Sequence, residues 1–177
     1  MEIYFLRHAN AGEPKLDPTS DEERPLDKLG IEQSHSVGRA LAALDLKLDA
    51  VIASPLTRAL QTAEIAAEEL GYKGKIVTDA ALRPEASYEQ FQALLRRHGR
   101  KGAILLVGHN PSMTEFVNQM LFPEASRDAV EMKKGAMVKV EKDGSRPAVL
   151  KWSMTPKVIR AIQQASASSS RAKTVSK

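Results

Sequence analysis

Apolar residues in the first 122 positions follow two alternating patterns. Short, largely apolar runs are typical of strands buried on both faces of a sheet. The longer segments between them carry apolar residues three or four positions apart, which indicates helices with one inward face. The predicted strands are residues 1–6, 49–53, 75–78 and 103–107. The predicted helices are residues 28–44, 55–70, 87–98 and 111–122.

Local signals mark several of the boundaries. Ser54 followed by Pro55 predicts an N-cap and a proline in the first helical position. Gly71 is predicted to end the same helix, because glycine readily adopts the left-handed conformation found after a helix. Residues 9–25 are polar and contain three prolines, so this segment is predicted to be a loop.

The pattern changes after Lys134 to a period of two. Residues 136–140 and 148–154 alternate apolar and polar side chains on either side of an Asp143-Gly144 turn, which predicts an antiparallel hairpin. The predicted fold class is therefore α/β: a single three-layer domain whose mostly parallel sheet has helices on both faces and the C-terminal hairpin at an edge.

The end of the chain has a different character. Val158, Ile159 and Ile162 have helical spacing and are expected to dock on the body, whereas residues 165–170 contain only Ala and Ser. Such a segment buries too little apolar surface to offset its ordering entropy. We therefore expect a domain at residues 1–158, followed over 159–177 by a short helix and a basic, disordered tail.

Composition excludes several classes of protein. The chain has no cysteine, which excludes disulfide scaffolds, cysteine-ligated metal sites and thiolate nucleophiles. The net charge of +4 comes from the tail, because five basic residues in 156–177 leave 21 basic against 22 acidic residues elsewhere. A nearly neutral body argues against nucleic acid as a partner. No run approaches the ~18 apolar residues of a membrane span, and the start, with Glu2, does not resemble a signal peptide, so a cytoplasmic protein is expected.

Two of the four histidines come directly after predicted strands. His8 follows the first strand, His109 follows the most apolar one, and ligands of open α/β sheets bind at the carboxyl ends of strands. Arg7 precedes His8, and Arg58 lies near the start of the helix after the second strand. Guanidinium groups match phosphate oxygens, and helix N-termini favour anions. These four residues therefore predict an anion pocket at one edge of the sheet.

Three blocks of the sequence contain the four residues of the predicted pocket. They are Leu6-Arg7-His8-Ala9, Ser54-Pro55-Leu56-Thr57-Arg58-Ala59-Leu60-Gln61-Thr62-Ala63 and Gly108-His109-Asn110-Pro111. In sequence and in order, these blocks resemble the signatures of the histidine phosphatase superfamily, which has the phosphoglycerate mutase-like fold. Two shorter features, Arg24-Pro25-Leu26 with Gly30 and Trp152 with Pro156, are similar to its short SixA-type branch of phosphohistidine phosphatases. The resemblance covers about residues 1–158.

The resemblance implies a role for each of the four site residues. His8 is expected to attack phosphorus and become phosphohistidine, while Arg7 and Arg58 hold the non-bridging oxygens. His109 is expected to donate a hydrogen bond to the same phosphoryl group. Prepositioned cations suit a transition state that spreads charge over its equatorial oxygens. No cofactor is expected, and no metal-ligand spacing is present in the sequence.

Two departures from the family pattern affect the expected chemistry. Ala9 stands where the signature has glycine. Larger members of the superfamily have an acidic residue that protonates the leaving group, and Glu85 is the nearest candidate here. An alkoxide needs such a proton, but a phosphorylated imidazole leaves as a group with a reference pKa of about 6.5 and needs less help. This difference favours phosphohistidine as the substrate.

Several alternatives stay open. Asn10 could touch phosphate or form a local turn, and Arg24 could contact substrate or hold its loop to Asp21 or Glu22. Ser54 is interpreted as an N-cap, and His35 and His98 as ordinary surface or capping residues. The expected partner is a phosphohistidine-bearing protein or a small phosphorylated substrate, with no nucleic acid and no membrane. The rival functions are a small-molecule phosphomonoesterase of the same fold and a non-catalytic phosphate-binding module.

Overall fold

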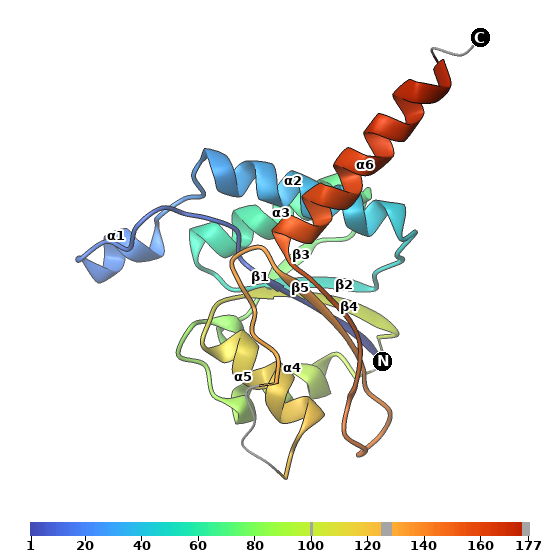
Figure 1. Ribbon diagram of the computed structural model, residues 1–177. Coiled ribbons are helices and arrows are strands. Elements are labelled where there is room, and N and C mark those ends of the chain that lie inside the picture. The colour runs from blue at the N-terminus through green and yellow to red at the C-terminus, as the bar shows by residue number, and fades with distance from the viewer. Residues whose placement is uncertain (100, 125–128, 175–177) are drawn as a thin grey trace.

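The computed structural model describes residues 1–99, 101–124 and 129–174. Figure 1 shows one sheet between two layers of helices, with α2 and α3 on one face and α4 and α5 on the other. The strands are β1 (Glu2–Arg7), β2 (Ala50–Ala53), β3 (Ile76–Thr78), β4 (Ala103–Gly108), β5 (Met137–Glu141) and β6 (Val149–Met154). The helices are α1 (Pro18–Glu22), α2 (Lys28–Ala43), α3 (Thr57–Leu70), α4 (Tyr88–Arg97), α5 (Ser112–Leu121) and α6 (Pro156–Thr174), with a 3₁₀ turn at Ala80–Leu82.

The six strands lie in the order β3-β2-β4-β1-β5-β6. The pairs β2–β3, β2–β4 and β1–β4 are parallel, whereas β1–β5 and β5–β6 are antiparallel. The predicted fold class is confirmed, because the hairpin of β5 and β6 lies at one edge of an otherwise parallel sheet. This order places β1, β4 and β2 side by side, so their carboxyl ends form one continuous rim.

Successive side chains of the central strands point alternately to the two faces of the sheet and pack in a separate core cluster on each face. Ile3 and Phe5 of β1 belong to the cluster beneath α4 and α5, where Phe91 and Phe116 stack with ring centroids 4.4 Å apart. Tyr4 belongs to the other cluster, with residues of α2, α3 and α6. Both faces of the parallel sheet are thus covered, which is why its strands are apolar along their whole length.

Two predicted boundaries in the first half of the chain are wrong. The expected loop at residues 9–25 contains α1, whose N-cap Asp17 accepts a hydrogen bond from the Ser20 amide and whose first residue is Pro18. Asp-Pro is a helix-start signal, but a helix of five residues is too short for an apolar stripe. The helix predicted from Pro55 begins at Thr57 with Leu56 as its N-cap, because the Ser54 side chain is engaged elsewhere.

The last helix is longer than the short helix that the sequence predicts. It continues through the Ala/Ser segment to Thr174, because alanine is the strongest helix former and no Gly or Pro interrupts the segment. Of the three residues expected to dock, Ile159 is buried, but Val158 and Ile162 are about half exposed. In Figure 1, α6 projects away from the body. The disorder expected at the end falls partly on residues 175–177, outside the described residues.

Candidate active site

The two histidines lie next to each other at the rim formed by β1, β4 and β2. Register pairs Arg7 of β1 with Gly108 of β4, so the residue after each strand is a histidine on the same rim. The amide of His8 also donates to the Gly108 carbonyl at 2.9 Å. The imidazole centroids of His8 and His109 are 4.8 Å apart with an angle of 51° between the rings. The structure therefore brings the predicted pair together.

His8 is held as a neutral imidazole with a defined tautomer. Its Nδ1 lies 2.7 Å from the Ala9 carbonyl oxygen, and because a carbonyl only accepts, Nδ1 carries the proton. The lone pair is therefore on Nε2. Burial lowers the pKa of His8 to about 3, and the positive charges of Arg58, Arg7 and Lys134 act in the same direction. A neutral imidazole with a free Nε2 lone pair is a competent nucleophile at neutral pH.

His109 is the more deeply buried of the pair. Its Nε2 lies 2.9 Å from the hydroxyl of Ser54, at the carboxyl end of β2. Burial, together with the neighbouring His8 and arginines, lowers the pKa of His109 to about 2. His109 is therefore neutral and carries one ring N–H. The sequence interpretation of Ser54 as an N-cap is wrong, since its hydroxyl contacts this histidine.

Arg7 and Arg58 approach the histidines from two sides, and each is held at one nitrogen. Nη1 of Arg7 donates to the Met132 carbonyl at 2.8 Å, and Nη1 of Arg58 donates to the Asp21 carbonyl at 2.7 Å. Burial lowers the pKa of both guanidinium groups, although Glu131 and Asp21 oppose the shift. Such tethers fix the direction in which each guanidinium presents its remaining donors.

Three buried side-chain nitrogens in the described part of the chain have no hydrogen-bond partner, and all belong to this site. They are Nε of Arg7, Nε of Arg58 and Nδ1 of His109. Buried donors without partners are costly and therefore rare. His109 lies against His8, and the charges of Arg7 and Arg58 act on His8, so these three nitrogens fit an oxyanion whose oxygens accept hydrogen bonds from all of them. The helices α3 and α5 also begin at this edge of the sheet, so their N-terminal dipoles favour an anion there.

Two further residues, not predicted as site residues, support the geometry. Thr62 of α3 accepts a hydrogen bond from the Ala9 amide at 3.1 Å and donates to the Arg58 carbonyl at 2.6 Å, so it connects the chain after β1 to the first turn of α3. Gly30 allows α2 to approach this chain, because a Cβ there would lie 1.9 Å from the Asn10 carbonyl oxygen. The Thr62 position follows Arg58 by one helical turn, a spacing that could have indicated its role.

Asn10 and Arg24 hold the loop that borders the pocket. The side chain of Asn10 donates to Asp27 at 2.5 Å and accepts from Lys134 at 3.2 Å. Arg24 is buried, donates to Asp21 at 2.8 Å and to the Ala11 carbonyl at 2.7 Å. Arg24 thus holds its loop to Asp21, one of the two alternatives left open by the sequence. The side chain of Asn10 makes no local turn but contacts two residues that are distant in sequence.

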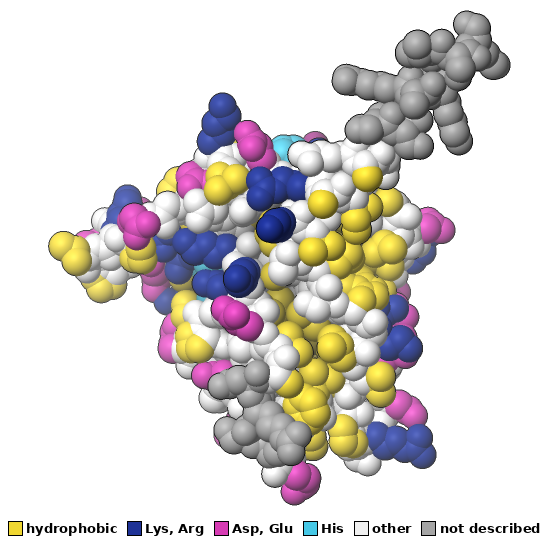
Figure 2. All heavy atoms as spheres, in the orientation of Figure 1, with side chains coloured by type: hydrophobic (Ala, Val, Ile, Leu, Met, Phe, Trp, Pro, Cys, Tyr) yellow, Lys and Arg dark blue, Asp and Glu magenta, His cyan; other side chains and the backbone are white. Residues whose placement is uncertain are grey.

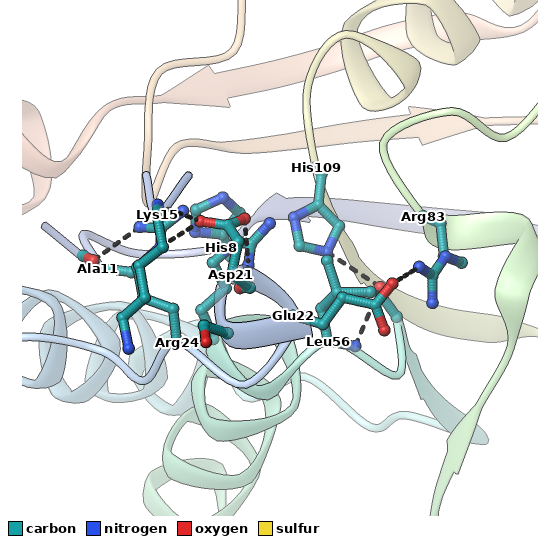
Figure 3. A network of polar contacts seen from close by, with 12 residues as sticks. His8, Ala11, Lys15, Asp21, Glu22, Arg24, Leu56, Arg83 and His109 are labelled. Carbon is teal, nitrogen blue, oxygen red and sulfur yellow. Dashed lines mark hydrogen bonds and ion pairs between the residues drawn. The ribbon is translucent and has the colours of Figure 1, made fainter. Parts of the chain in front are cut away.

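Three carboxylates in this region, those of Asp21, Glu22 and Glu85, are paired with arginines. Figure 3 shows Asp21 and Glu22 of α1 near the two histidines, with Glu22 in contact with Arg83. A hydrogen bond from Arg24 lowers the pKa of Asp21. The side chain of Glu85 is two-thirds exposed. Partial burial raises the pKa of Glu85, but the hydrogen bond from Arg83 at 2.7 Å, a backbone hydrogen bond and the charge of Arg83 together lower it by more, so the net shift is downward. The structure therefore does not support Glu85 as a proton donor.

The surroundings of the pocket are basic. In Figure 2, Lys and Arg side chains gather beside the base of α1, with histidine visible among them. Among the residues that the structure describes, no group of three or more His, Asp or Glu side chains is arranged to hold a metal ion. The described helices also include none that is long and apolar enough to cross a membrane. The charges of Arg7, Arg58 and Lys134 act on His8.

Comparisons with known proteins relate this chain to a family of phosphatases. The family model described as histidine phosphatase superfamily (branch 1) matches residues 3–94. An uncharacterized protein of Picosynechococcus sp. is 33% identical over 149 residues, which cover 82% of this chain and 88% of that protein. Phosphohistidine phosphatase SixA of Escherichia coli is 26% identical over 158 residues, covering 88% of this chain and 94% of that protein. The solved structure of the protein histidine phosphatase SixA complexed with tungstate has a TM-score of 0.77 at 24% identity, covering 88% of this chain and 97% of that one.

Proposed function

The chain belongs to the histidine phosphatase superfamily, and from this premise we propose that it removes phosphate from phosphohistidine on a protein through a phosphorylated His8. Phosphatase chemistry follows from the family and from its named relatives. The nucleophile, the substrate and the independence from metal are the parts that we add. The observation that carries the proposal is a neutral His8 with a free Nε2 lone pair, beside His109 and within the electrostatic influence of Arg7 and Arg58, which together have three buried nitrogens without partners.

The proposed reaction has two displacement steps. In the first, Nε2 of His8 forms a bond to phosphorus while the phosphorus–nitrogen bond of the substrate breaks. The electron pair stays on the substrate nitrogen, and if the second ring nitrogen carries a proton, the leaving group is neutral imidazole. In the second step, water attacks phosphorus, its protons stay with the phosphate, and the electron pair of the broken bond returns to Nε2 of His8.

The other three residues stabilise the charge that both steps place on the phosphoryl oxygens. Nε of Arg7, Nε of Arg58 and Nδ1 of His109 are the donors that these oxygens would meet. Removing one donor of this kind typically lowers kcat by about 10²–10³-fold, because a preorganised donor strengthens as charge develops. Both arginines are tethered at Nη1, so their donors are oriented before the substrate binds.

The carboxylates support phosphohistidine over a phosphate ester. An alkoxide leaving group needs a proton from an acid, and a carboxylic acid supplies one only when its pKa is raised. Among the described residues, Asp21, Glu22 and Glu85 are each paired with an arginine, and the pKa values of Asp21 and Glu85 are lowered. A protonated phosphoimidazole needs no such donor, so this site suits a phosphorus–nitrogen bond.

A turnover screen without added metal tests the proposal. The substrates are a phosphohistidine peptide, a phosphoserine peptide of the same sequence and a sugar phosphate, and each is assayed with wild-type protein and His8→Ala. We expect turnover of the phosphohistidine peptide alone and a loss of about 10³-fold or more in His8→Ala. Rapid quenching should trap phosphate on His8 of the wild-type protein.

The rivals give different results in the same screen. Comparable rates on the sugar phosphate would favour a small-molecule phosphomonoesterase. Phosphate binding with neither turnover nor a trapped phosphoenzyme would favour a non-catalytic binding module. Near-normal turnover in His8→Ala would remove His8 from the proposed role.

A further inference from the structure

Ser54 is a fully buried hydroxyl with two contacts at the edge of the pocket. It lies directly after β2, and its relative exposure is 0%. Its Oγ accepts a hydrogen bond from the Leu56 amide at 3.4 Å and lies 2.9 Å from Nε2 of His109. It does not cap α3, whose N-cap Leu56 has no side-chain bond. The hydroxyl is therefore available to act on the histidine.

The count of donors and acceptors allows Ser54 to donate its proton to His109. A hydroxyl has one proton to donate and two lone pairs that accept. The Leu56 amide already uses one lone pair, and the described acceptor within hydrogen-bond distance of Oγ is Nε2 of His109. If Ser54 donates its proton to Nε2, the single N–H of the neutral His109 imidazole must be on Nδ1.

That assignment places the proton on the nitrogen that faces the reaction. Nδ1 of His109 is buried and has no partner among the described residues. In Figure 3 this second nitrogen lies on the side of the ring that faces His8. In the opposite tautomer, Nε2–H would donate to Ser54, and Nδ1 would present a lone pair to the phosphoryl oxygens. The same imidazole would then repel the group that it is proposed to stabilise.

We propose that Ser54 is a positioning residue that fixes His109 in the Nδ1–H tautomer, so that His109 donates a hydrogen bond to the transferring phosphoryl group. The inference rests on the proposed function of the site. It also explains why a serine at this position is buried against a histidine that is 55 residues away in sequence. His109 is neutral over the working range of pH, so it has one N–H and the choice of nitrogen decides whether it donates.

The tautomer can be observed directly and independently of turnover. In uniformly ¹⁵N-labelled full-length protein, the ring nitrogens of His109 give chemical shifts that distinguish a protonated from an unprotonated nitrogen. We expect the wild-type protein to show Nδ1 protonated and Nε2 unprotonated and accepting a hydrogen bond. A wild-type spectrum with the proton on Nε2 would overturn the proposal, while the turnover of the phosphohistidine peptide would still stand or fall separately.

Variants connect the tautomer to the reaction. Ser54→Ala removes the donor, and Ser54→Thr keeps a hydroxyl at the same atom. Groups that orient an active imidazole typically contribute about 10–100-fold, and a wrong tautomer in a catalytic triad costs up to about 10⁴-fold. We therefore expect Ser54→Ala to lower kcat on the phosphohistidine peptide by about 10–100-fold, with a smaller change in KM, and Ser54→Thr to restore much of it.

Ser34→Ala is the matched control. Ser34 is also fully buried, and its hydroxyl donates a hydrogen bond to the Gly30 carbonyl at 2.8 Å, but it lies within α2. The Ser34→Ala variant should lose about as much stability as Ser54→Ala, but it should keep the wild-type kcat and the wild-type chemical shifts of the His109 ring nitrogens. If Ser54→Ala keeps both its kcat and the Nδ1–H shifts, the proposal is wrong. If Ser54→Ala does not fold, the wild-type spectrum and Ser54→Thr still decide the outcome.

Discussion

The two site histidines should make the protein sensitive to mild acid. Burial lowers the pKa of His8 to about 3 and that of His109 to about 2, from 6.5 for a free side chain. Below pH ~6.5 the unfolded chain therefore binds two protons that the folded chain rejects. The free energy of unfolding must fall as pH falls, until the pH approaches the folded pKa values. Above about pH 7 the two histidines contribute no such dependence.

The magnitude follows from the linkage relation. One pKa unit corresponds to about 1.4 kcal/mol, so well below pH ~6.5 each histidine lowers the free energy of unfolding by about 1.4 kcal/mol per pH unit. Between pH ~6 and pH ~4.5 the loss is about 2 kcal/mol for each histidine. A typical domain has about 5–15 kcal/mol in total, so the pair removes a large share of it.

Urea unfolding followed by circular dichroism measures this loss at several pH values between ~7 and ~4.5. The proteins are the wild type, His8→Asn, His109→Asn and the double variant. The carboxylates titrate alike in all four, so their contribution cancels when the free energies of unfolding are compared. Relative to wild type, the double variant should gain about 4 kcal/mol between pH ~6 and pH ~4.5, and each single variant about half. Ser34→Ala removes no titrating group, so its difference from wild type should stay constant.

A constant difference between the wild type and the double variant would refute the reasoning. It would mean that the folded protein accepts protons on these imidazoles as easily as the unfolded chain does. His8 would then be largely cationic in mild acid, with no lone pair on Nε2. The neutral nucleophile on which the proposed mechanism depends would be lost with it.

Three other outcomes are expected. Arg58→Ala should raise KM and lower kcat on the phosphohistidine peptide by about 10²-fold or more, because in the proposed mechanism the guanidinium contacts the phosphoryl group in both ground and transition states. Arg39→Ala is the control, since Arg39 pairs with Glu69 away from the site, and it should change neither KM nor kcat. Tungstate should inhibit competitively and raise Tm through preferential binding to the folded protein, whereas a chelator should change nothing; recovery of a chelated sample by magnesium or zinc would reveal a missed metal site. A chain that ends at Gln164 should keep wild-type turnover on the peptide. It retains the buried Ile159 and the hydrogen bond from Gln163 to the Ser36 carbonyl at 2.9 Å. Loss of turnover would show that the removed segment completes the fold.

The alternation of the main strands and helices, and the position of His8 and His109 at one rim of the sheet, could be predicted from the sequence alone. Strand and helix patterns are local, because burial of one or two faces of an element sets the spacing of apolar residues along that short stretch of sequence. His8 and His109 each directly follow an apolar strand, and parallel strands bring such positions to one rim. The closing hairpin was likewise visible in its alternation.

The contacts between segments that are distant in sequence could be learned only from the tertiary structure. Ser54 looked like a helix cap because its neighbours in sequence are Pro55 and a helix, yet its hydroxyl meets a histidine 55 residues away. The proximity of α1 to the pocket depends on Arg58 binding the Asp21 carbonyl 37 residues earlier. Nothing in local periodicity encodes such pairs, because a buried polar group takes whichever partner the packed chain places within hydrogen-bond distance. The residues proposed to carry the chemistry can therefore be identified from the sequence. Their tautomers, the hydrogen bonds that hold them and their donors without partners are properties of the folded chain.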